Sequence, residues 1–503
     1  MAKSNYFIIE LKLNTNNNHL AVLTKRFNIA EKMYNKTLKF ALKNLKRMKE
    51  NKSYKQTLNK YLEYKKLNDE ENIKIYSDLL NSIRLSYSLS EYQFHSFIKI
   101  QQNMYKKHID SNTSQKIATS VWKAIEDVLY KKGKKVHFKK YNSLISVEGK
   151  SNKTGIRYLK EINILSWNKL NIPVKIRKND LFIQESLENH KIKYCRITRK
   201  PFKKGYKYFL QLIMDGIPPA KRINSTGAFR HTATPNNRVG IDIGTSTIAV
   251  CSQKELILTE LSLNSNKYDK EINKLYRKLD RSKRATNPNN FNSDGTIKRG
   301  IKLKWIYSNN YKKNLFKLKN LYRLKANYIK LEHNKLSNKI LTLGNQVYVE
   351  TMRFKALQKR SKETTINEKT GRFNKKKRFG RSLNHKAPSM LLSIIDRKLK
   401  YQGLSLNKIN TTTFKASQYN HIEDKYIKKN LNTGWNIING EYIQRDLYSA
   451  FLIMNSRENL RTVDKSLCDL TYNEFRIKHD ELIDKMRKDD IKYPKSFGIK
   501  KII

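Results

Sequence analysis

The stretch VGIDIGTSTIAV, Val239–Val250, constrains the fold of this chain more than any other segment. Its apolar residues predict two strands joined by a tight turn at Gly244 and Thr245. One acid, Asp242, lies within the first strand. Two chemistries place an acid at such a point: a turn that holds the phosphates of ATP, and a strand that holds a metal ion over a phosphodiester.

The charge of the chain indicates its partner. Lys and Arg number 105 against 43 Asp and Glu, which gives a formal net charge of +62 over 503 residues. Small acidic metabolites cannot neutralise so many charges, whereas a nucleic acid can. The alternative is a solvated lysine surface without a partner. With 38% hydrophobic residues, the chain can build a sizeable core, and its length suits roughly two to four domains.

Cysteine usage and hydropathy suggest a compartment. Cys195, Cys251 and Cys468 are far apart, which favours a reducing environment without a disulfide framework. No run approaches the roughly 18 apolar residues of a membrane span. The first residues alternate like a strand rather than a signal peptide. We therefore expect a cytoplasmic protein with no membrane partner.

In the first half of the chain, the spacing of the apolar residues changes twice between a strand pattern and a helical pattern. Residues 6–13 alternate in the manner of a strand, with Ile9, Leu11 and Leu13 on one face. A helical pattern follows to about residue 130. Its first helix has an apolar stripe of Leu23, Phe27, Ala30, Tyr34, Leu38, Leu42 and Leu45. Residues 136–216 are rich in strand patterns, so a helical insertion separates the opening strand from its sheet.

The second half begins after a linker at 217–237, which is rich in Pro, Gly, Ser and Asn. A new domain starts at Arg238. It contains a long basic helix with a predicted buried stripe of Leu315, Leu318, Tyr322, Ile329, Leu336 and Ile340. Further predicted elements are a strand at 345–350, a basic loop at 363–382, a helix at 389–402 and another helix that begins around residue 446.

Three acids of this domain are candidates for one site: Asp242 in a strand, Glu350 at the end of a strand, and Asp446 at the start of a helix. Hydrolysis of a phosphodiester is helped by two hard cations roughly 4 Å apart. Such cations prefer carboxylate oxygens. Asp242 could bridge both ions. Alternatively, Asp242 belongs to an ATPase turn, Glu350 is solvated at the sheet edge, and Asp446 is a helix-start acid favoured by the dipole.

The segments VGIDIGTSTIAV, QVYVETMRF and QRDLYSAFLI resemble the three RuvC motifs of the transposon-encoded TnpB proteins and their type V CRISPR effector relatives. The basic helices between the first two motifs, the stretch RSLNHKAPSMLLSIIDRKLKYQG and the segment TTTFKASQ are also similar to that family. The resemblance is strong from Arg238 to Asn455. Before that it rests on the order of the elements.

This resemblance implies an α+β multidomain fold: an RNase H-like (RuvC) α/β nuclease domain, plus a β-barrel-like wedge domain that carries a helical recognition insertion. The implied segments are a first wedge strand at 1–15, a helical recognition domain at 16–130, a wedge domain and linker at 131–237, the nuclease domain with its first two motifs at 238–408, a degenerate ribbon at 409–440, and the third motif with the C-terminal tail at 441–503.

The implied activity is that of an RNA-guided DNA endonuclease, with a guide RNA and double-stranded target DNA beside a short flanking motif as partners. Asp242, Glu350 and Asp446 would be its catalytic residues and would hold Mg²⁺, with two ions expected. Two alternatives remain: a guide-dependent DNA-binding protein or repressor without cleavage, and an RNase H-fold ATPase or transposase. An ATPase would need a second acidic phosphate motif and an adenosine-binding glycine pair, and neither is evident.

The chain departs from the family at two places. The family usually has a four-cysteine zinc ribbon between the second and third motifs, but residues 409–440 contain no cysteine. A lone histidine, His421, cannot supply a tetrahedral zinc site, so we expect no zinc and interpret His421 as an ordinary polar residue. We expect Trp435 and Ile437 to replace the metal as the core of this remnant. Tyr448 stands where the family has asparagine.

Overall fold

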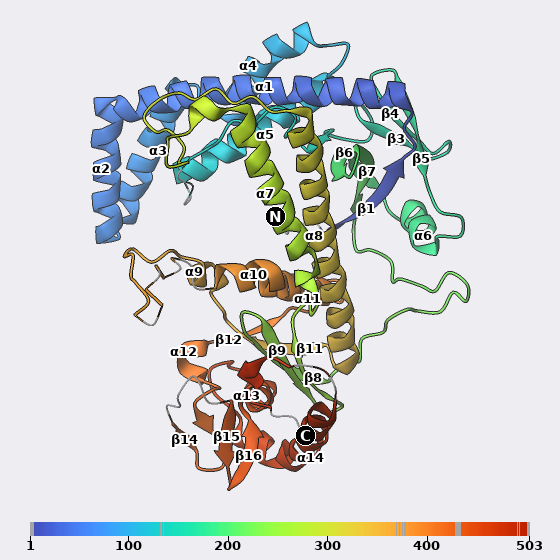
Figure 1. Cartoon of the computed structure of the whole chain (residues 1–503), viewed down its shortest axis with the longest axis vertical. Coiled ribbons are helices and arrows are strands. Elements are labelled where there is room, and N and C mark those ends of the chain that lie inside the picture. The colour runs from blue at the N-terminus through green and yellow to red at the C-terminus, as the bar shows by residue number, and fades with distance from the viewer. Residues whose placement is uncertain are drawn as a thin grey trace. The chain divides into compact units, whose positions relative to one another are not determined.

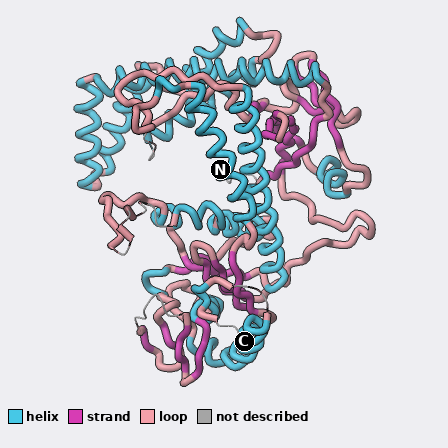
Figure 2. The backbone as a smooth tube through the Cα atoms, in the orientation of Figure 1, coloured by secondary structure: helices cyan, strands magenta, loops and turns pink. Residues whose placement is uncertain are grey.

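The computed structural model describes residues 5–130, 133, 135–368, 370–371, 373–374, 376, 379–427, 434–489, 491 and 493–499. The chain forms two compact units, Met1–Ala228 and Phe229–Ile503, here named unit 1 and unit 2. The division falls inside the stretch 217–237, whose composition is that of a linker. Each unit contains both helices and a sheet (Figure 1, Figure 2).

The sheet of unit 1 is antiparallel, and its order β2-β6-β7-β1-β5-β4-β3 leaves it open as a curled half-barrel. The predicted opening strand is β1, Tyr6–Leu13, and it pairs with β7 and β5 as expected. Ile9, Leu11 and Leu13 are buried. The other strands are β2 Ser146–Glu148, β3 Arg157–Leu159, β4 Ile164–Trp167, β5 Leu170–Lys175, β6 Ile192–Phe202 and β7 Gly205–Asp215.

The helices of unit 1 lie mostly between β1 and β2, which confirms the predicted helical insertion. They are α1 Asn17–Glu50, α2 Lys52–Leu67, α3 Glu70–Ser86, α4 Glu91–Met104 and α5 Ser111–Tyr130, with α6 Leu181–Asn189 after β5. The predicted stripe of α1 is buried, except that Leu42 is only partly so. In contrast, α2 and α3 pack on each other and contribute no buried residue.

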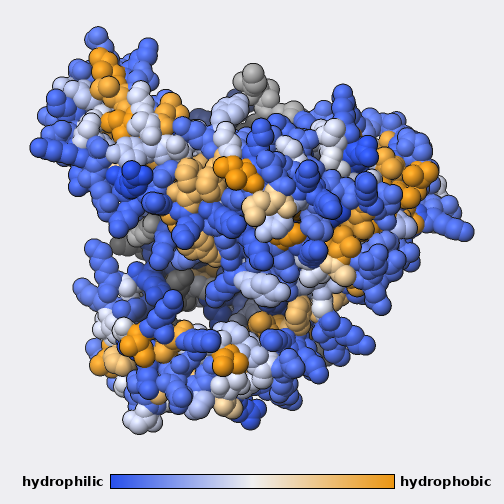
Figure 3. Space-filling view, turned by 90° about the horizontal axis from the view of Figure 1, so that it is seen from above, coloured by the Kyte–Doolittle hydropathy of each residue, from blue (hydrophilic) through white to orange (hydrophobic). Residues whose placement is uncertain are grey.

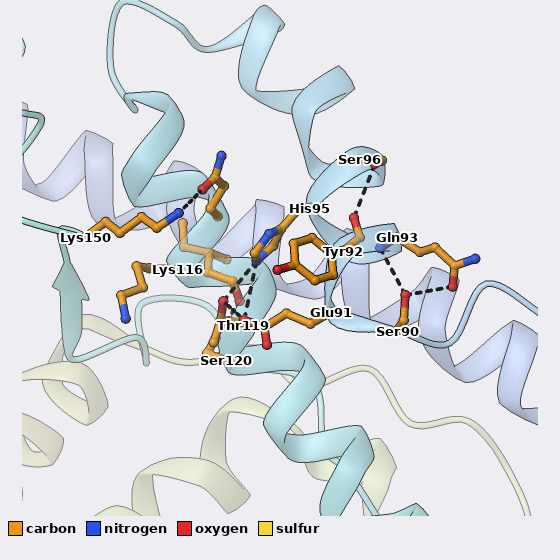
Figure 4. A network of polar contacts seen from close by, with 12 residues as sticks. Ser90, Glu91, Tyr92, Gln93, His95, Ser96, Lys116, Thr119, Ser120 and Lys150 are labelled. Atoms are coloured by element: carbon orange, nitrogen blue, oxygen red, sulfur yellow. Dashed lines mark hydrogen bonds and ion pairs between the residues drawn. The ribbon is translucent and has the colours of Figure 1, made fainter. Parts of the chain in front are cut away.

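Polar contacts hold α4 against α5 (Figure 4). Thr119 of α5 donates to the Glu91 carboxylate at 2.6 Å, and its hydroxyl lies 3.0 Å from Nε2 of His95. Ser90 caps α4, because its hydroxyl accepts from the backbone N–H of Gln93. The N-terminal half of α4 is therefore held against α5, and α4 also contacts α1.

Unit 2 contains a five-stranded sheet of order β10-β9-β8-β11-β12. Its first three strands are antiparallel, whereas β8, β11 and β12 run parallel. The strands are β8 Arg238–Ile243, β9 Thr247–Ser252, β10 Leu256–Glu260, β11 Gln346–Glu350 and β12 Asn407–Ile409; two short hairpins are formed by β13 Tyr419–Asn420 with β14 Lys425–Tyr426 and by β15 Trp435–Ile438 with β16 Glu441–Gln444.

Helices cover both faces of this sheet. One core contains the inward residues of β8 with parts of α8 and α11, and the other contains α13 and α14. The helical elements of unit 2 are η1 Ser265–Tyr268, α7 Asp269–Thr286, η2 Pro288–Asn290, α8 Asn309–Leu343, α9 Phe354–Leu357, α10 Gly380–Lys386, α11 Pro388–Lys400, α12 Thr411–Phe414, α13 Arg445–Met454, α14 Lys465–Lys488 and η3 Lys495–Phe497.

Two predictions for unit 2 need correction. Tyr322 of α8 is 45% exposed instead of buried, and its hydroxyl lies 2.9 Å from that of Tyr276 on α7; Leu315 and Leu336 of the same stripe are only partly buried. The predicted loop 363–382 ends earlier than expected, since α10 begins at Gly380. Part of that loop lies outside the described residues.

Candidate active site

Asp242 lies on β8, on the face of the sheet that α13 covers. Val239, Ile241 and Ile243 are buried against the opposite core. Because side chains alternate along a strand, Gly240 and Asp242 project from the other face. The apolar alternation of this segment thus explains both its burial and the direction of its acid.

Glu350 ends the neighbouring parallel strand β11. The register pairs Val347 with Val239 and Val349 with Ile241. One step further along both strands, Glu350 comes beside Asp242, and residues side by side in a sheet share a face. The order of the sheet therefore brings the first and second acids together, although they are far apart in the chain.

The third acid is brought over the sheet by the close packing of α13 on β8. A Cβ added at Gly240 would lie 2.1 Å from the carbonyl oxygen of Ala450 and 2.4 Å from the backbone nitrogen of Met454. Only glycine permits this approach. Asp446 lies one helical turn before Ala450, and Asp242 lies two residues beyond Gly240. The helix therefore places Asp446 over the acidic end of β8.

The start of α13 is fixed by two hydrogen bonds at Gln444. Its side chain caps the helix by accepting from the backbone N–H of Leu447 at 2.8 Å. Its own backbone N–H donates to Nε2 of His479 at 2.9 Å. The other ring nitrogen of His479 lies 2.8 Å from a carboxylate oxygen of Asp480. Burial lowers the pKa of His479, which keeps its ring neutral and able to accept.

The three acids interact electrostatically. Burial raises the pKa of Asp242 well above its ordinary value, and the negative charges of Asp446 and Glu350 raise it further, while Arg445 acts in the opposite direction. Burial also raises the pKa of Glu350. Asp446 forms an ion pair with Arg445 at 3.1 Å. Without a cation, this arrangement holds more negative charge than its surroundings compensate.

The donor set fits Mg²⁺ in its chemistry. Carboxylate oxygens are the ligands that Mg²⁺ prefers, and a divalent cation would lower the pKa of Asp242 and relieve the repulsion among the acids. Within the part of the chain that the structure describes, no three Asp, Glu, His or Cys side chains are grouped tightly enough to enclose an ion. Asp446 is instead paired with Arg445, which a metal ion would have to displace.

The two places where the chain departs from the family pattern contact each other. His421 and Tyr448 are both fully buried. The Tyr448 hydroxyl lies 2.7 Å from Nδ1 of His421 and accepts from the His421 backbone N–H at 3.2 Å. Burial lowers the pKa of His421 to about 4. His421 is thus a buried polar residue that links the segment before β14 to Tyr448 of α13, and its lack of a metal-binding role stays a prediction.

The predicted core of the ribbon remnant was half wrong. Ile437 is 61% exposed, while Ile438 is fully buried. The buried side chains of β15 are therefore those of its even-numbered residues, whereas we expected the odd-numbered ones. Trp435 is partly buried, and its indole N–H donates to the carbonyl oxygen of Gly498 at 2.9 Å. Residues 428–433 of this segment lie outside the described residues.

Sequence reasoning missed Gly240, Arg445 and His479, each of which acts on the acids or on the element that carries them. Gly240 offered a signal, because a glycine inside a strand often marks close approach of another backbone. Arg445 was visible as the neighbour of an acid. Nothing local indicated that His479 would reach Gln444 from a different helix.

Basic and aromatic side chains lie together on α7, α8 and the segments that precede these helices. The Lys283 ammonium lies 3.7 Å from the centre of the Trp305 ring, and the Lys267 ammonium lies 4.1 Å from that of Tyr328. Hydrophilic residues cover most of the face in Figure 3. Among the described residues, no helix has both the length and the apolar character needed to cross a bilayer.

No family model matches the chain, and no curated protein matches it in sequence. Solved structures do match. A chain of the Cas12f1–sgRNA–target DNA complex aligns at 12% identity with a TM-score of 0.40, over 90% of this chain and 99% of that one. A chain of a CRISPR-Cas12f ternary complex aligns at 12% identity with a TM-score of 0.22, over 88% and 82%. Such TM-scores do not establish a shared fold.

Proposed function

We propose that this chain is an RNA-guided DNA endonuclease that hydrolyses both strands of its target at one RuvC-like site. The observation that carries the proposal is the convergence of Asp242, Glu350 and Asp446 in a chain of net charge +62. Three neighbouring carboxylates favour the binding of metal ions. A basic surface favours the binding of a nucleic acid, and metal-assisted hydrolysis of a phosphodiester backbone uses both properties.

In this proposal the acids act by binding and orientation. Asp242 and Glu350 project side by side from β8 and β11, and Asp446 projects from α13. Bound Mg²⁺, with two ions expected, would supply activation of water and stabilisation of the leaving oxygen. The ion pair of Asp446 with Arg445 would be exchanged for coordination of the ions. The order and direction of the five strands support the RNase H-like fold that the sequence motifs imply.

A second candidate is guided DNA binding without cleavage. It is favoured by the Arg445–Asp446 ion pair and by the lack of a closed ligand group among the described residues. The presence of all three acids favours the nuclease, because neighbouring carboxylates repel one another and would also repel the phosphates of bound DNA unless metal ions lay between them. The transposon or CRISPR origin of the chain is not needed for either function.

The first experiment identifies the guide. We expect the full-length protein to co-purify with an RNA of defined sequence, because a dedicated guide is retained over a large basic surface. The RNA is released and sequenced. A random mixture of cellular transcripts, with no enriched species, would contradict a dedicated guide.

The second experiment tests guided cleavage. The recovered RNA is re-targeted to a plasmid library with randomised flanks, and cutting is measured with Mg²⁺ and with chelator. The nuclease proposal expects Mg²⁺-dependent cutting that depends on a few flanking positions, read through base edges by residues 1–216. Guide-dependent binding without any cutting would support the second candidate instead.

A further inference from the structure

A cavity of about 750 Å³ lies in unit 1 between α1 and the C-terminal end of α4. This volume is within the range of sites that bind small molecules or single nucleotides. The cavity is unrelated to the three acids, which all belong to unit 2. Asn103 and Met104 at the end of α4 form one wall, while the polar contacts of Figure 4 hold the start of that helix against α5.

The lining of this cavity is basic. Its ionisable side chains are those of Lys25, Lys32, Lys106, Lys107 and His108, and no acid lines it among the described residues. Burial lowers the pKa of His108, and the nearby cations Lys25 and Arg26 lower it further. The cavity is therefore a region of positive potential that an anion would stabilise.

An aromatic ring is held at the cavity. Tyr141 lines it and is 81% exposed. The backbone after Tyr141 is fixed by Glu31, whose carboxylate accepts from the N–H groups of Asn142 at 2.9 Å and Ser143 at 2.7 Å. The Tyr206 hydroxyl also donates to the carbonyl oxygen of Asn142. An exposed ring on a fixed backbone is a ready surface on which a planar base can stack.

The cavity also contains an amide with unused hydrogen-bonding capacity. Asn28 lies in the wall, and its Oδ1 is buried without a hydrogen-bond donor from the described part of the chain. This oxygen therefore has the capacity to accept a hydrogen bond from a ligand. A nucleobase carries N–H groups at its edge, and these can donate a hydrogen bond to such an oxygen.

We propose that this cavity binds one unpaired nucleotide of a nucleic-acid strand. The base would stack on Tyr141 with its edge toward Asn28, and the adjoining phosphates would contact Lys25, Lys32 and the lysines that follow α4. A fully paired duplex is disfavoured, because one of its bases must first be unpaired and unstacked before it can enter the cavity. The inference rests on the proposed function only in that the partner of this chain is a nucleic acid.

The test measures binding without cleavage. The full-length protein, freed of cellular RNA at high salt, is titrated in the presence of chelator into fluorescein-labelled hairpins. One hairpin is fully paired, and the others carry a single bulged A, C, G or U; each is made as RNA and as the matching DNA with T for U. We expect at least one bulged hairpin to bind about tenfold more tightly than the paired one, the size of one base-stacking contact.

Matched variants test whether the preference for bulged hairpins arises at the cavity. Tyr141→Ala is compared with Tyr92→Ala, because Tyr92 is 82% exposed on α4 outside the cavity lining. The double change Lys25→Ala/Lys32→Ala is compared with Lys36→Ala/Lys43→Ala, which removes two exposed charges from the same helix at the same spacing. We expect the cavity variants to lose the preference for the bulge and the control variants to keep it.

The outcomes separate this inference from the proposed nuclease. Equal binding of paired and bulged hairpins by the wild type, in both RNA and DNA, overturns the inference and leaves guided cleavage standing. Equal loss of preference in cavity and control variants also overturns it, since the effect would then be one of charge or folding alone. A preserved bulge preference in a protein that never cuts DNA would support the cavity and contradict the nuclease.

Discussion

Asp242 is a carboxylate held where a negative charge is unfavourable. Burial and the charges of Asp446 and Glu350 raise its pKa, so the metal-free protein favours its neutral form. A residue in this state destabilises the fold at neutral pH unless a cation binds beside it. At the scale of single residues, the buried charge of Asp242 costs stability, and the proposed metal ion would offset that cost.

We expect Asp242→Asn to raise the melting temperature of the metal-free protein at neutral pH. Above the ordinary pKa of 3.8 the unfolded chain releases a proton that the folded state retains, so the stability of the wild type falls as pH rises toward the raised pKa. Asparagine does not titrate, so the gap should widen from pH 5 to pH 8. Mg²⁺ should stabilise the wild type alone. An equal response of both proteins to Mg²⁺ would contradict the assignment.

His421 gives a pH dependence of the opposite sign. Burial lowers its pKa from 6.5 to about 4, so the unfolded chain binds more protons between these values and stability falls as pH drops from 6.5 to 4. This linkage amounts to up to about 3 kcal/mol. We expect His421→Gln to show a weaker decline in urea-unfolding free energy over that window. The exposed His137→Gln variant serves as the control, and an unchanged decline in His421→Gln would contradict the burial of His421.

At the scale of elements, the packing of α13 on β8 decides whether the three acids meet. The helix lies directly on the strand at Gly240, where no side chain separates the two backbones. Its start is held by Gln444 and His479, and its second turn by the Tyr448–His421 contact. Small shifts of this helix would move Asp446 relative to Asp242 and Glu350.

We expect Gly240→Ala to destabilise the protein by about 1–3 kcal/mol, as overpacking does, and to reduce cleavage more than target binding. The added methyl would lie 2.1 Å from the Ala450 carbonyl oxygen, so α13 must move. Gly244→Ala is the control, because its added carbon would first meet the Thr247 hydroxyl at 3.1 Å. Urea unfolding and single-turnover cleavage measure both effects. Equal stability and cutting in the two variants would contradict the close approach.

The elements themselves were predictable from the sequence, whereas their contacts were not. Periodicity was sufficient for β1, α1 and β11, because burial on one face imposes the period. It failed at Ile437 and Tyr322, where the choice of face depends on a neighbouring element. Direct contacts such as His421 with Tyr448 join residues that no local pattern connects. The three acids were found because motifs, not periodicity, marked them.

At the scale of the whole molecule, the dominant property is the large positive net charge. A chain of net charge +62 repels itself until a polyanion neutralises it, so the nucleic acid that we propose as its partner would also stabilise the folded chain. The acids are a local exception inside this basic chain. Under the proposed function, binding would depend on many lysines and arginines and cutting on three carboxylates, so the two activities should be separable by mutation.

The most direct test of this separation measures guided cleavage of both DNA strands and target binding side by side. It compares the wild type, Asp242→Ala, Glu350→Ala, Asp446→Ala and the exposed control Glu458→Ala, with Mg²⁺ and with chelator. We predict that each of the three variants loses cutting of both strands and keeps target affinity within about threefold, because the duplex is held by basic residues, and that Glu458→Ala cuts normally. Full cutting by Asp242→Ala, or loss of binding in step with cutting, would contradict the account.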